Sequence, residues 1–306
     1  MIKVNAMYVA ALMVFGLTSL INAQRDDFPV LKGPYLGQKP PGAYPEIFAP
    51  GIISVDSNFE HSTAVFSPDG SEVFWCANVG WYGKKGQQGN LRLYFMKIVD
   101  SKWTAPQPAP FVKDKRVARP VFSPDGDRLY LEYSVDQANP DNNDIFFVER
   151  KGEGWSEPMP VSPLINSPAW DRLHCLTADG SLYFSRNPGT PIEAVYVSRF
   201  VGGEFTKPEK LGKDYDSDAA EFAIVFGPNG DYMLTATSNA QHGSDLCVSY
   251  RKAGGTWTER IKTPYECGGF LSLSPDGKYL FMLNEAICWV STSFVEDLRP
   301  KQGLVD

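Results

Sequence analysis

Charged and aromatic side chains recur at matching positions ahead of a repeated turn, and together they could bind a polar ligand. They stand four to seven residues before the turn and come from four successive repeats. The set consists of Glu60, His61, Arg116, Arg119, Trp170, Asp171, Arg172 and Glu221. Arginines supply forked donors, carboxylates accept hydroxyl protons, and Trp170 offers a stacking face. These residue types predict a site for a small anionic or sugar-like ligand.

Three of these residues, Glu60, Asp171 and Glu221, are also weak candidates for catalysis. Glycoside hydrolysis requires two carboxyl groups, about 5 Å apart for retention and about 6.5–9.5 Å apart for inversion. No hydrolase signature surrounds them, and charges at such positions can also simply pair with one another or with water. We therefore expect a non-catalytic binding or scaffold protein. A carbohydrate-active hydrolase or lyase is the alternative, and a sensor for a protein partner is a third hypothesis.

The turn that sets these positions occurs five times, at intervals of 56, 54, 50 and 47 residues. Its copies are Ser67–Gly70, Ser123–Gly126, Thr177–Gly180, Gly227–Gly230 and Ser274–Gly277. Proline presets φ for the second position of a type I turn, and Asp or Asn suits the third. The closing glycine then adopts the left-handed conformation, which lets the chain return as a hairpin. Each copy therefore predicts a turn between two antiparallel strands.

The residues around each turn predict four strands per repeat. Apolar strands enter and leave the turn, and a third strand follows. A fourth begins at an aromatic residue such as Trp103 or Trp155, with a proline three residues later that only an edge strand tolerates. Four antiparallel strands in about 50 residues are typical of a β-propeller blade. The fifth repeat lacks its fourth strand, and we expect Tyr44–Pro50 to supply it by pairing with Ile287–Val290.

These observations predict an all-β fold: a single β-propeller of five four-stranded antiparallel blades, closed by an N-terminal strand. A six-bladed propeller is the alternative. The turn and the tyrosine-rich strand after it resemble the WD40-like repeats of TolB-type β-propellers over about residues 45–298. The resemblance implies a structural role for the turn, in a family of periplasmic binding scaffolds, peptidase propellers and polysaccharide-lyase domains. TolB-type proteins carry six shorter blades and an N-terminal α/β domain, and neither is visible in this sequence.

The N-terminus has the pattern of a cleaved Sec-type signal peptide. Lys3 precedes the uncharged apolar stretch Ala6–Leu20, and Ala23 provides a small residue at the cleavage point. We expect a signal peptide over residues 1–23, an extended segment over 24–44, the propeller over 45–298 and a tail over 299–306. The mature chain should be periplasmic or extracellular, with no stable insertion into the membrane.

Composition narrows the classes of partner. The 306 residues hold 29 Lys and Arg against 36 Asp and Glu, a net charge of −7 with no basic block, which argues against nucleic acid as a partner. No Cys-x-x-Cys or Cys/His cluster has zinc spacing, so we expect no metal and no cofactor. The chain has five cysteines, and an odd number leaves at least one of them free in an exported protein. We expect a monomer.

The fifth repeat leaves a gap in the predicted ring of rim residues. At the matching positions it offers only Cys267, Gly268 and Gly269, which have little side-chain bulk. We expect this gap to be the open side of the pocket, facing the less polar part of the ligand. Arg119 and Arg172 would hold the charged end. Replacing both by alanine should abolish binding at a modest cost in stability.

Overall fold

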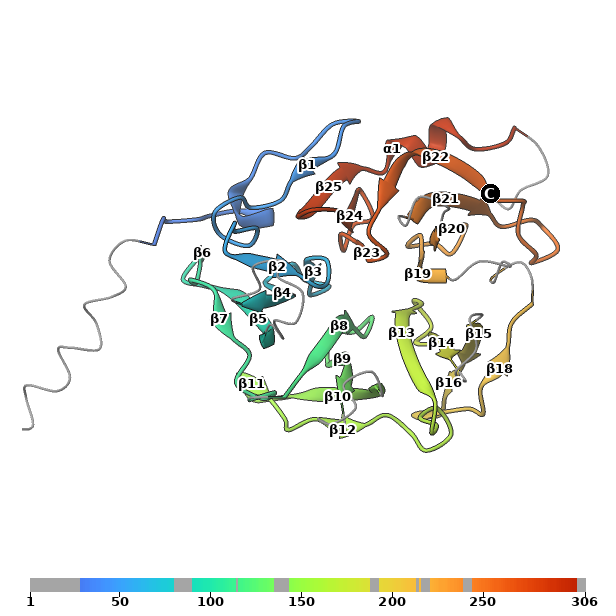
Figure 1. Cartoon of the computed structure of the whole chain (residues 1–306), viewed down its shortest axis with the longest axis horizontal. Helices are drawn as coiled ribbons and strands as arrows, with labels where there is room; N and C mark the ends of the chain where they lie inside the picture. Colours follow the sequence, from blue (N-terminus) through green and yellow to red (C-terminus); the bar gives the residue numbers. More distant parts are fainter. Residues whose placement is uncertain are drawn as a thin grey trace, which may run out of the picture.

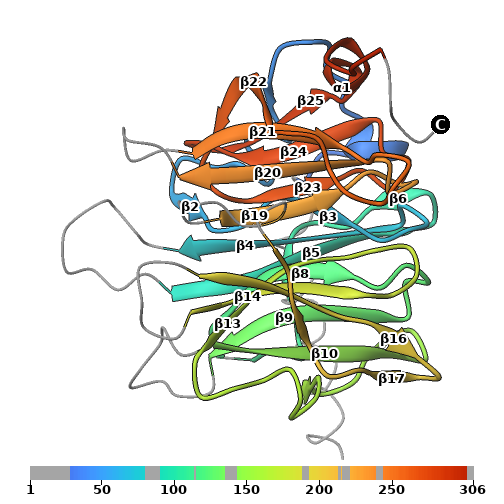
Figure 2. The ribbon, with the colours of Figure 1, turned by 90° about the vertical axis from the view of Figure 1, so that its right-hand side faces the viewer.

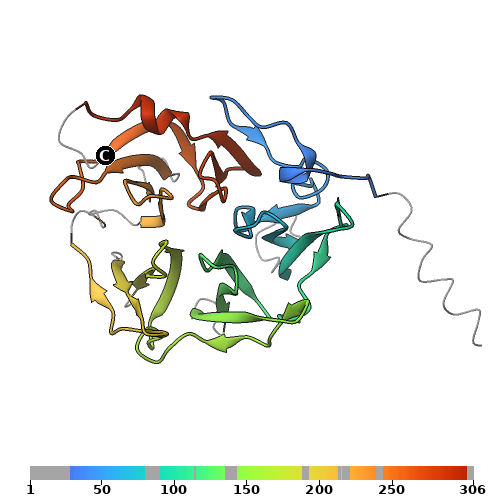
Figure 3. The ribbon, with the colours of Figure 1, turned by 180° about the vertical axis from the view of Figure 1, so that it is seen from behind.

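The chain folds into a ring of five β-sheets around a central axis (Figure 1; Figure 3 gives the opposite face). The structure is a computed structural model, and it describes residues 28–79, 90–113, 115–134, 143–187, 193–212, 215, 221–238 and 244–301. The predicted signal peptide over residues 1–23 lies outside these ranges. The prediction of an all-β propeller with five antiparallel blades is confirmed.

Each blade is a sheet whose strands follow one another outward from the axis in chain order, except in blade five, where the outermost strand is the N-terminal β1. Blade one contains β2 (Asn58–Glu60), β3 (Val65–Phe66), β4 (Glu72–Val79), β5 (Asn90–Val99), β6 (Lys102–Trp103) and β7 (Gln107–Pro108). Blade two contains β8 (Val117–Phe122), β9 (Arg128–Ser134), β10 (Asn143–Lys151), β11 (Gly154–Trp155) and β12 (Met159–Pro160). Blade three contains β13 (Trp170–Leu176), β14 (Leu182–Asn187), β15 (Ala194–Ser198) and β18 (Glu209–Lys210), next to the small hairpin of β16 (Phe200–Val201) and β17 (Glu204–Phe205).

The remaining two blades complete the ring. Blade four contains β19 (Glu221–Phe226), β20 (Tyr232–Ser238), β21 (Ser244–Tyr250) and β22 (Ile261–Cys267). Blade five contains β23 (Leu271–Leu273), β24 (Tyr279–Leu283), β25 (Ile287–Ser291) and β1 (Glu46–Ile47), and the short helices are η1 (Pro34–Gly37) and α1 (Ser293–Asp297). In the side view the long strands, such as β4, β10 and β20, run from one face of the ring to the other (Figure 2). No helix among the described residues has the length and apolar character needed to span a membrane.

The repeated turns form as their sequence predicts. In the first copy the Asp69 carboxylate accepts hydrogen bonds from Ser67 Oγ at 2.6 Å and from the Ser71 amide at 3.0 Å. The Gly70 amide donates to the Ser67 carbonyl at 2.8 Å, which closes the turn. The five closing glycines all have φ between +67° and +80°, a region that side chains disfavour. The turns therefore fix where each innermost strand ends.

The fourth strands differ from the prediction in one respect. The aromatic residue ends a two-residue strand, as Trp103 does in β6, which pairs with the end of β5, the third strand of its blade. The proline three residues later lies in a break, and the outer strand resumes after it as β7, β12 or β18. Because Pro106, Pro158 and Pro208 fall in these breaks, the missing amide removes no ladder hydrogen bond.

The N-terminal segment closes the ring. Strand β1 pairs antiparallel with β25, with Glu46 opposite Trp289 and Ile47 opposite Cys288. The adjoining Phe48 is fully buried, and its ring lies 5.0 Å from that of Phe281 and 5.1 Å from that of Trp289. The first and last strands of the propeller therefore share one sheet. All five cysteines are free thiols.

Candidate functional site: the rim cavity

Five of the eight predicted site residues line one cavity of about 300 Å³, which we call the rim cavity. They come from three different blades, as the alignment of the repeats requires. The five are His61, Arg116, Arg119, Trp170 and Arg172. Sequence reasoning did not single out the other lining residues with polar or aromatic side chains, which are Glu132, Asn143 and Phe270.

Strand β13 presents Trp170 and Arg172 to the cavity through its two-residue alternation. The Arg172 guanidinium lies 4.7 Å from the centre of the Trp170 ring, and its Nη2 atom lies 3.0 Å from Glu193 Oε1. Glu193 directly precedes β15, and 8% of it is exposed. The ring and the ion pair together hold the guanidinium in a fixed orientation.

A bulge in β8 directs Arg119 into the cavity. The pairing of β8 with β9 shifts between Ala118 and Val121, and Arg119 within the shift has φ of +49°. Such a conformation is costly for a residue with a side chain, and bulges redirect side chains near binding sites. The Arg119 guanidinium lies 4.3 Å from the centre of the Phe270 ring. Burial lowers the pKa of Arg119 to about 10, so the group is charged at neutral pH.

Glu132 of β9 is the carboxylate of the cavity. Its Oε1 atom accepts from Arg119 Nε at 3.0 Å and from the Leu173 amide of the next blade at 3.0 Å. Burial raises the pKa of Glu132, and the charge of Arg119 opposes this effect. The sequence contains a signal that could have identified Glu132 as a site residue, because it is the one charged side chain in the apolar run Leu129–Tyr133. A carboxylate in a buried strand needs a partner.

The fifth blade fills the gap that the sequence predicted. Gly268 and Gly269 line the cavity as expected, but Phe270 adds an aromatic side chain beside them. The His61 ring meets Phe270 edge to face at 5.2 Å. Cys267 is buried in the apolar core of blades four and five instead. The prediction that blade five contributes little bulk was therefore wrong, since Phe270 forms a wall of the cavity.

Neither of the two predicted catalytic carboxylates whose side chains are described, Glu60 and Asp171, lines the rim cavity. Asp171 is fully buried, and its oxygens accept from Arg186 Nε at 2.7 Å and from the Ser167 amide at 2.7 Å. Glu60 is 2% exposed, lies outside the lining, and has its pKa raised by burial. Glu221 begins β19, and its side chain lies outside the described part of the structure.

The cavity is positively charged in a chain that is negative overall. Its charged lining residues are three arginines and one glutamate, whereas the net charge of the chain is −7. Burial and the charges of the neighbouring arginines lower the pKa of His61 to about 4, so its imidazole is neutral at pH 7. No three metal-binding side chains lie close together among the described residues. The arrangement suits an anion held by guanidinium groups.

Comparisons with known proteins find similar structures and no similar sequences. No protein-family profile and no curated protein matches the chain. A TolB-like protein from Agrobacterium tumefaciens is 17% identical with a TM-score of 0.48, covering 72% of this chain and 68% of that one. The periplasmic gluconolactonase of Pseudomonas aeruginosa is 17% identical with a TM-score of 0.42, covering 73% and 65%.

A third similar structure is part of a longer enzyme. Prolyl oligopeptidase B from Galerina marginata is 14% identical with a TM-score of 0.43, and the match covers 73% of this chain but 30% of that one. Because all three similarities are this low, the function of this chain has to be argued from its own residues.

Proposed function

We propose that this protein is an exported, monomeric β-propeller that binds a small anionic, hydroxyl-rich ligand, such as a sugar acid, in the rim cavity. The observation that carries the proposal is the convergence of Arg116, Arg119 and Arg172 on one cavity of about 300 Å³. Pockets of this size commonly hold small ligands, and guanidinium groups match carboxylates in geometry and charge.

The three arginines have different roles in this proposal. Arg119 and Arg172 are each engaged by a buried glutamate, so they are held in place before the ligand arrives. Arg116 is exposed at the edge of the cavity and is the arginine best able to swing onto a carboxylate. Trp170 and Phe270 provide ring faces for the less polar side of a sugar, and Glu132 and Asn143 provide hydroxyl acceptors.

Calorimetric titration with D-glucuronate and D-glucose tests the proposal. The two sugars differ in one carboxylate, so an arginine site should bind glucuronate and leave glucose without measurable heat. Arg116→Gln should weaken glucuronate binding about tenfold or more, because a hydrogen bond to a charged group contributes roughly 1.5–3 kcal/mol. The matched control is Lys115→Gln, which removes the same charge from the exposed residue next to it. Equal affinity for both sugars would contradict the proposal.

A hydrolase is the second candidate function, and Glu132 is the observation that favours it. Its buried carboxyl has a raised pKa, as a general acid requires, and it lines the cavity. Among the described lining residues it is the one carboxyl group, so the second carboxyl that glycoside hydrolysis requires would have to come from another part of the chain. The residue differs from the predicted Glu60, Asp171 and Glu221. The test is hydrolysis of a glucuronide with a chromogenic leaving group. Release of the chromophore by the parent chain, and no release by Glu132→Gln, would support this function.

A further inference from the structure

A second, larger cavity lies at the end of the ring where the five repeated turns meet. Its volume is about 580 Å³, and residues from all five turns line it, so we call it the turn cavity. The turn cavity and the rim cavity share no lining residue. Whatever binds in the turn cavity is therefore recognised by a separate set of side chains.

The walls of the turn cavity are mainly apolar. Phe122, Phe226 and Leu271 contribute side chains from three blades. The second residue of each turn adds a small apolar face, and these residues are Pro68, Pro124, Ala178, Pro228 and Pro275. Apolar walls with a few polar groups are typical of sites for organic ligands.

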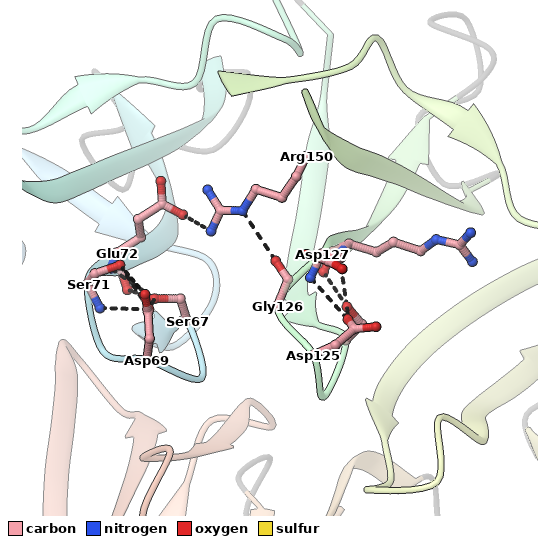
Figure 4. A network of polar contacts seen from close by, with 10 residues as sticks. Ser67, Asp69, Ser71, Glu72, Asp125, Gly126, Asp127 and Arg150 are labelled. Carbon is pink, nitrogen blue, oxygen red and sulfur yellow. Dashed lines mark hydrogen bonds and ion pairs between the residues drawn. The ribbon is translucent and has the colours of Figure 1, made fainter. Parts of the chain in front are cut away.

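Two arginines at equivalent repeat positions give this cavity its charge. Arg199 and Arg251 stand directly after the third strands of blades three and four, and Arg150 is the last residue but one of the third strand of blade two. Arg150 is held by Glu72 of blade one at 2.5 Å and lies 4.0 Å from the centre of the Trp155 ring (Figure 4 shows the contact with Glu72). It is therefore occupied in joining two blades and does not line the turn cavity.

The other two arginines, Arg199 and Arg251, do line the turn cavity. Arg199 has an exposed side chain, and its closest carboxylate is Glu209 at 4.0 Å. Arg251 is exposed and has no ion pair with any described residue. Exposed pairs as long as that of Arg199 contribute little, so both guanidinium groups can bind a ligand.

The acidic side chain in the lining, Asp179, offsets one of the two positive charges but makes no ion pair with either arginine among the described residues. Asp179 accepts from Thr177 Oγ1 at 2.6 Å and from the Ser181 amide at 3.1 Å, so it is bound within its own turn. His174 adds a polar atom in an enclosed position. It is 5% exposed, its Nε2 atom lies 2.6 Å from Ser185 Oγ, and its buried Nδ1 atom has no partner. A partnerless buried ring nitrogen in a cavity wall points to a missing hydrogen-bond partner.

We propose that the turn cavity binds one amphipathic organic anion, such as an aromatic or alkyl carboxylate. Its apolar body lies between the turns, and its charged group is held by Arg199 and Arg251. This site is independent of the proposed function, because it uses none of the residues of the rim cavity.

Fluorescence titration with 8-anilinonaphthalene-1-sulfonate tests this site, because the probe is an aromatic anion that brightens in apolar surroundings. Its neutral counterpart is N-phenyl-1-naphthylamine. We expect saturable binding of one equivalent of the anion. Arg199→Gln with Arg251→Gln should weaken it at least about tenfold while leaving the neutral probe within about twofold, since charged hydrogen bonds are lost and the apolar walls are kept. Decanoate should displace the anionic probe at a concentration at least about tenfold lower than decanol, because only decanoate carries a charge for the two arginines.

The matched control is Lys207→Gln with Lys252→Gln, which removes the same charge from exposed residues outside the lining and should leave binding unchanged. Arg116→Gln should also leave the anionic probe unaffected, and this separates the site from the proposed function. Unchanged binding in the Arg199/Arg251 variant would overturn the proposal. The proposal would also be overturned if the Arg199/Arg251 variant lost as much affinity for the neutral probe as for the anionic one, or if Arg116→Gln weakened binding of the anionic probe. All the arginines replaced are exposed, so circular dichroism should confirm that each variant is folded.

Discussion

At the scale of single residues, two buried ion pairs hold the arginines of the rim cavity in place: Arg119 with Glu132, and Arg172 with Glu193. Arg119 and Glu132 are 12% and 3% exposed, and each would be costly to bury alone. The sequence predicted that replacing Arg119 and Arg172 by alanine would lower stability only modestly. Because both arginines pair with buried glutamates, we now expect a substantial loss.

Arg119→Ala should lower the free energy of unfolding by about 3–5 kcal/mol, because it leaves the Glu132 carboxylate buried without its partner. Adding Glu132→Gln should recover part of that loss, since the amide carries no charge. Urea unfolding of the single and double variants measures both values. If the double variant is less stable than Arg119→Ala, the ion pair does not explain the effect.

Stability should fall as pH drops from about 6.5 towards 4, in part because of His61. Its pKa is about 4 in the folded chain and about 6.5 when unfolded, so between these values only the unfolded state binds the proton. Proton uptake on unfolding lowers stability as pH falls. His174 acts in the same direction, while the raised pKa values of Glu60 and Glu132 act in the opposite one.

The comparison with His61→Gln isolates this contribution. Urea midpoints at pH 7.5 and pH 5.0 should differ more in the parent chain than in the variant. An identical decrease of the urea midpoint in the parent chain and in His61→Gln would show that protonation of His61 does not cause the pH dependence.

At the scale of elements, the five turns have the same backbone and different neighbours. A β-carbon on Gly277 would collide with the Pro228 ring of the preceding blade, whereas one on Gly70 would meet nothing within 4 Å. Both glycines have positive φ, +69° and +71°. Gly70→Ala should therefore cost about 1–2 kcal/mol through backbone strain alone, and Gly277→Ala about 1–3 kcal/mol more through the collision. Thermal unfolding of the two variants measures the difference in stability. Equal losses of stability would show that contact between neighbouring turns does not contribute.

The closing strand makes a prediction of its own. Phe48→Ala should destabilise the propeller by about 3–5 kcal/mol, because it empties a fully buried site against Phe281 and Trp289. Its neighbour Ile47 is 49% exposed, so Ile47→Ala should change stability by about 0.5 kcal/mol or less. Chemical unfolding compares the two. A small loss in Phe48→Ala would mean that the ring does not depend on this closure.

The repeats made the strands and turns predictable from the sequence. The bulge in β8 made the direction of the Arg119 side chain unpredictable. The five turns and the strands beside them follow from local chemistry, so blade number and closure could be predicted. Five of the eight rim positions line one cavity, and their role as a binding site stays a prediction. Strand alternation places Asp171 on the opposite side from Arg172, and this could have been read from the sequence. The inward turn of Arg119 at its bulge could not, because it depends on a local shift in pairing.

At the scale of the whole molecule, the five-fold repeat produces two ends with different chemistry. One end gathers three arginines from two blades, and the other gathers five turns around an apolar cavity. The scaffold repeats, but the side chains on it do not. The two proposed binding roles therefore rest on the few positions where the blades differ from one another.

The most direct test of the central claim is a crystal structure of the mature chain with bound D-glucuronate. The account predicts the ligand in the rim cavity, with its carboxylate within hydrogen-bonding distance of Arg116 and at least one of Arg119 and Arg172. Glucuronate bound elsewhere, or a rim cavity that stays empty at saturating ligand, would contradict it.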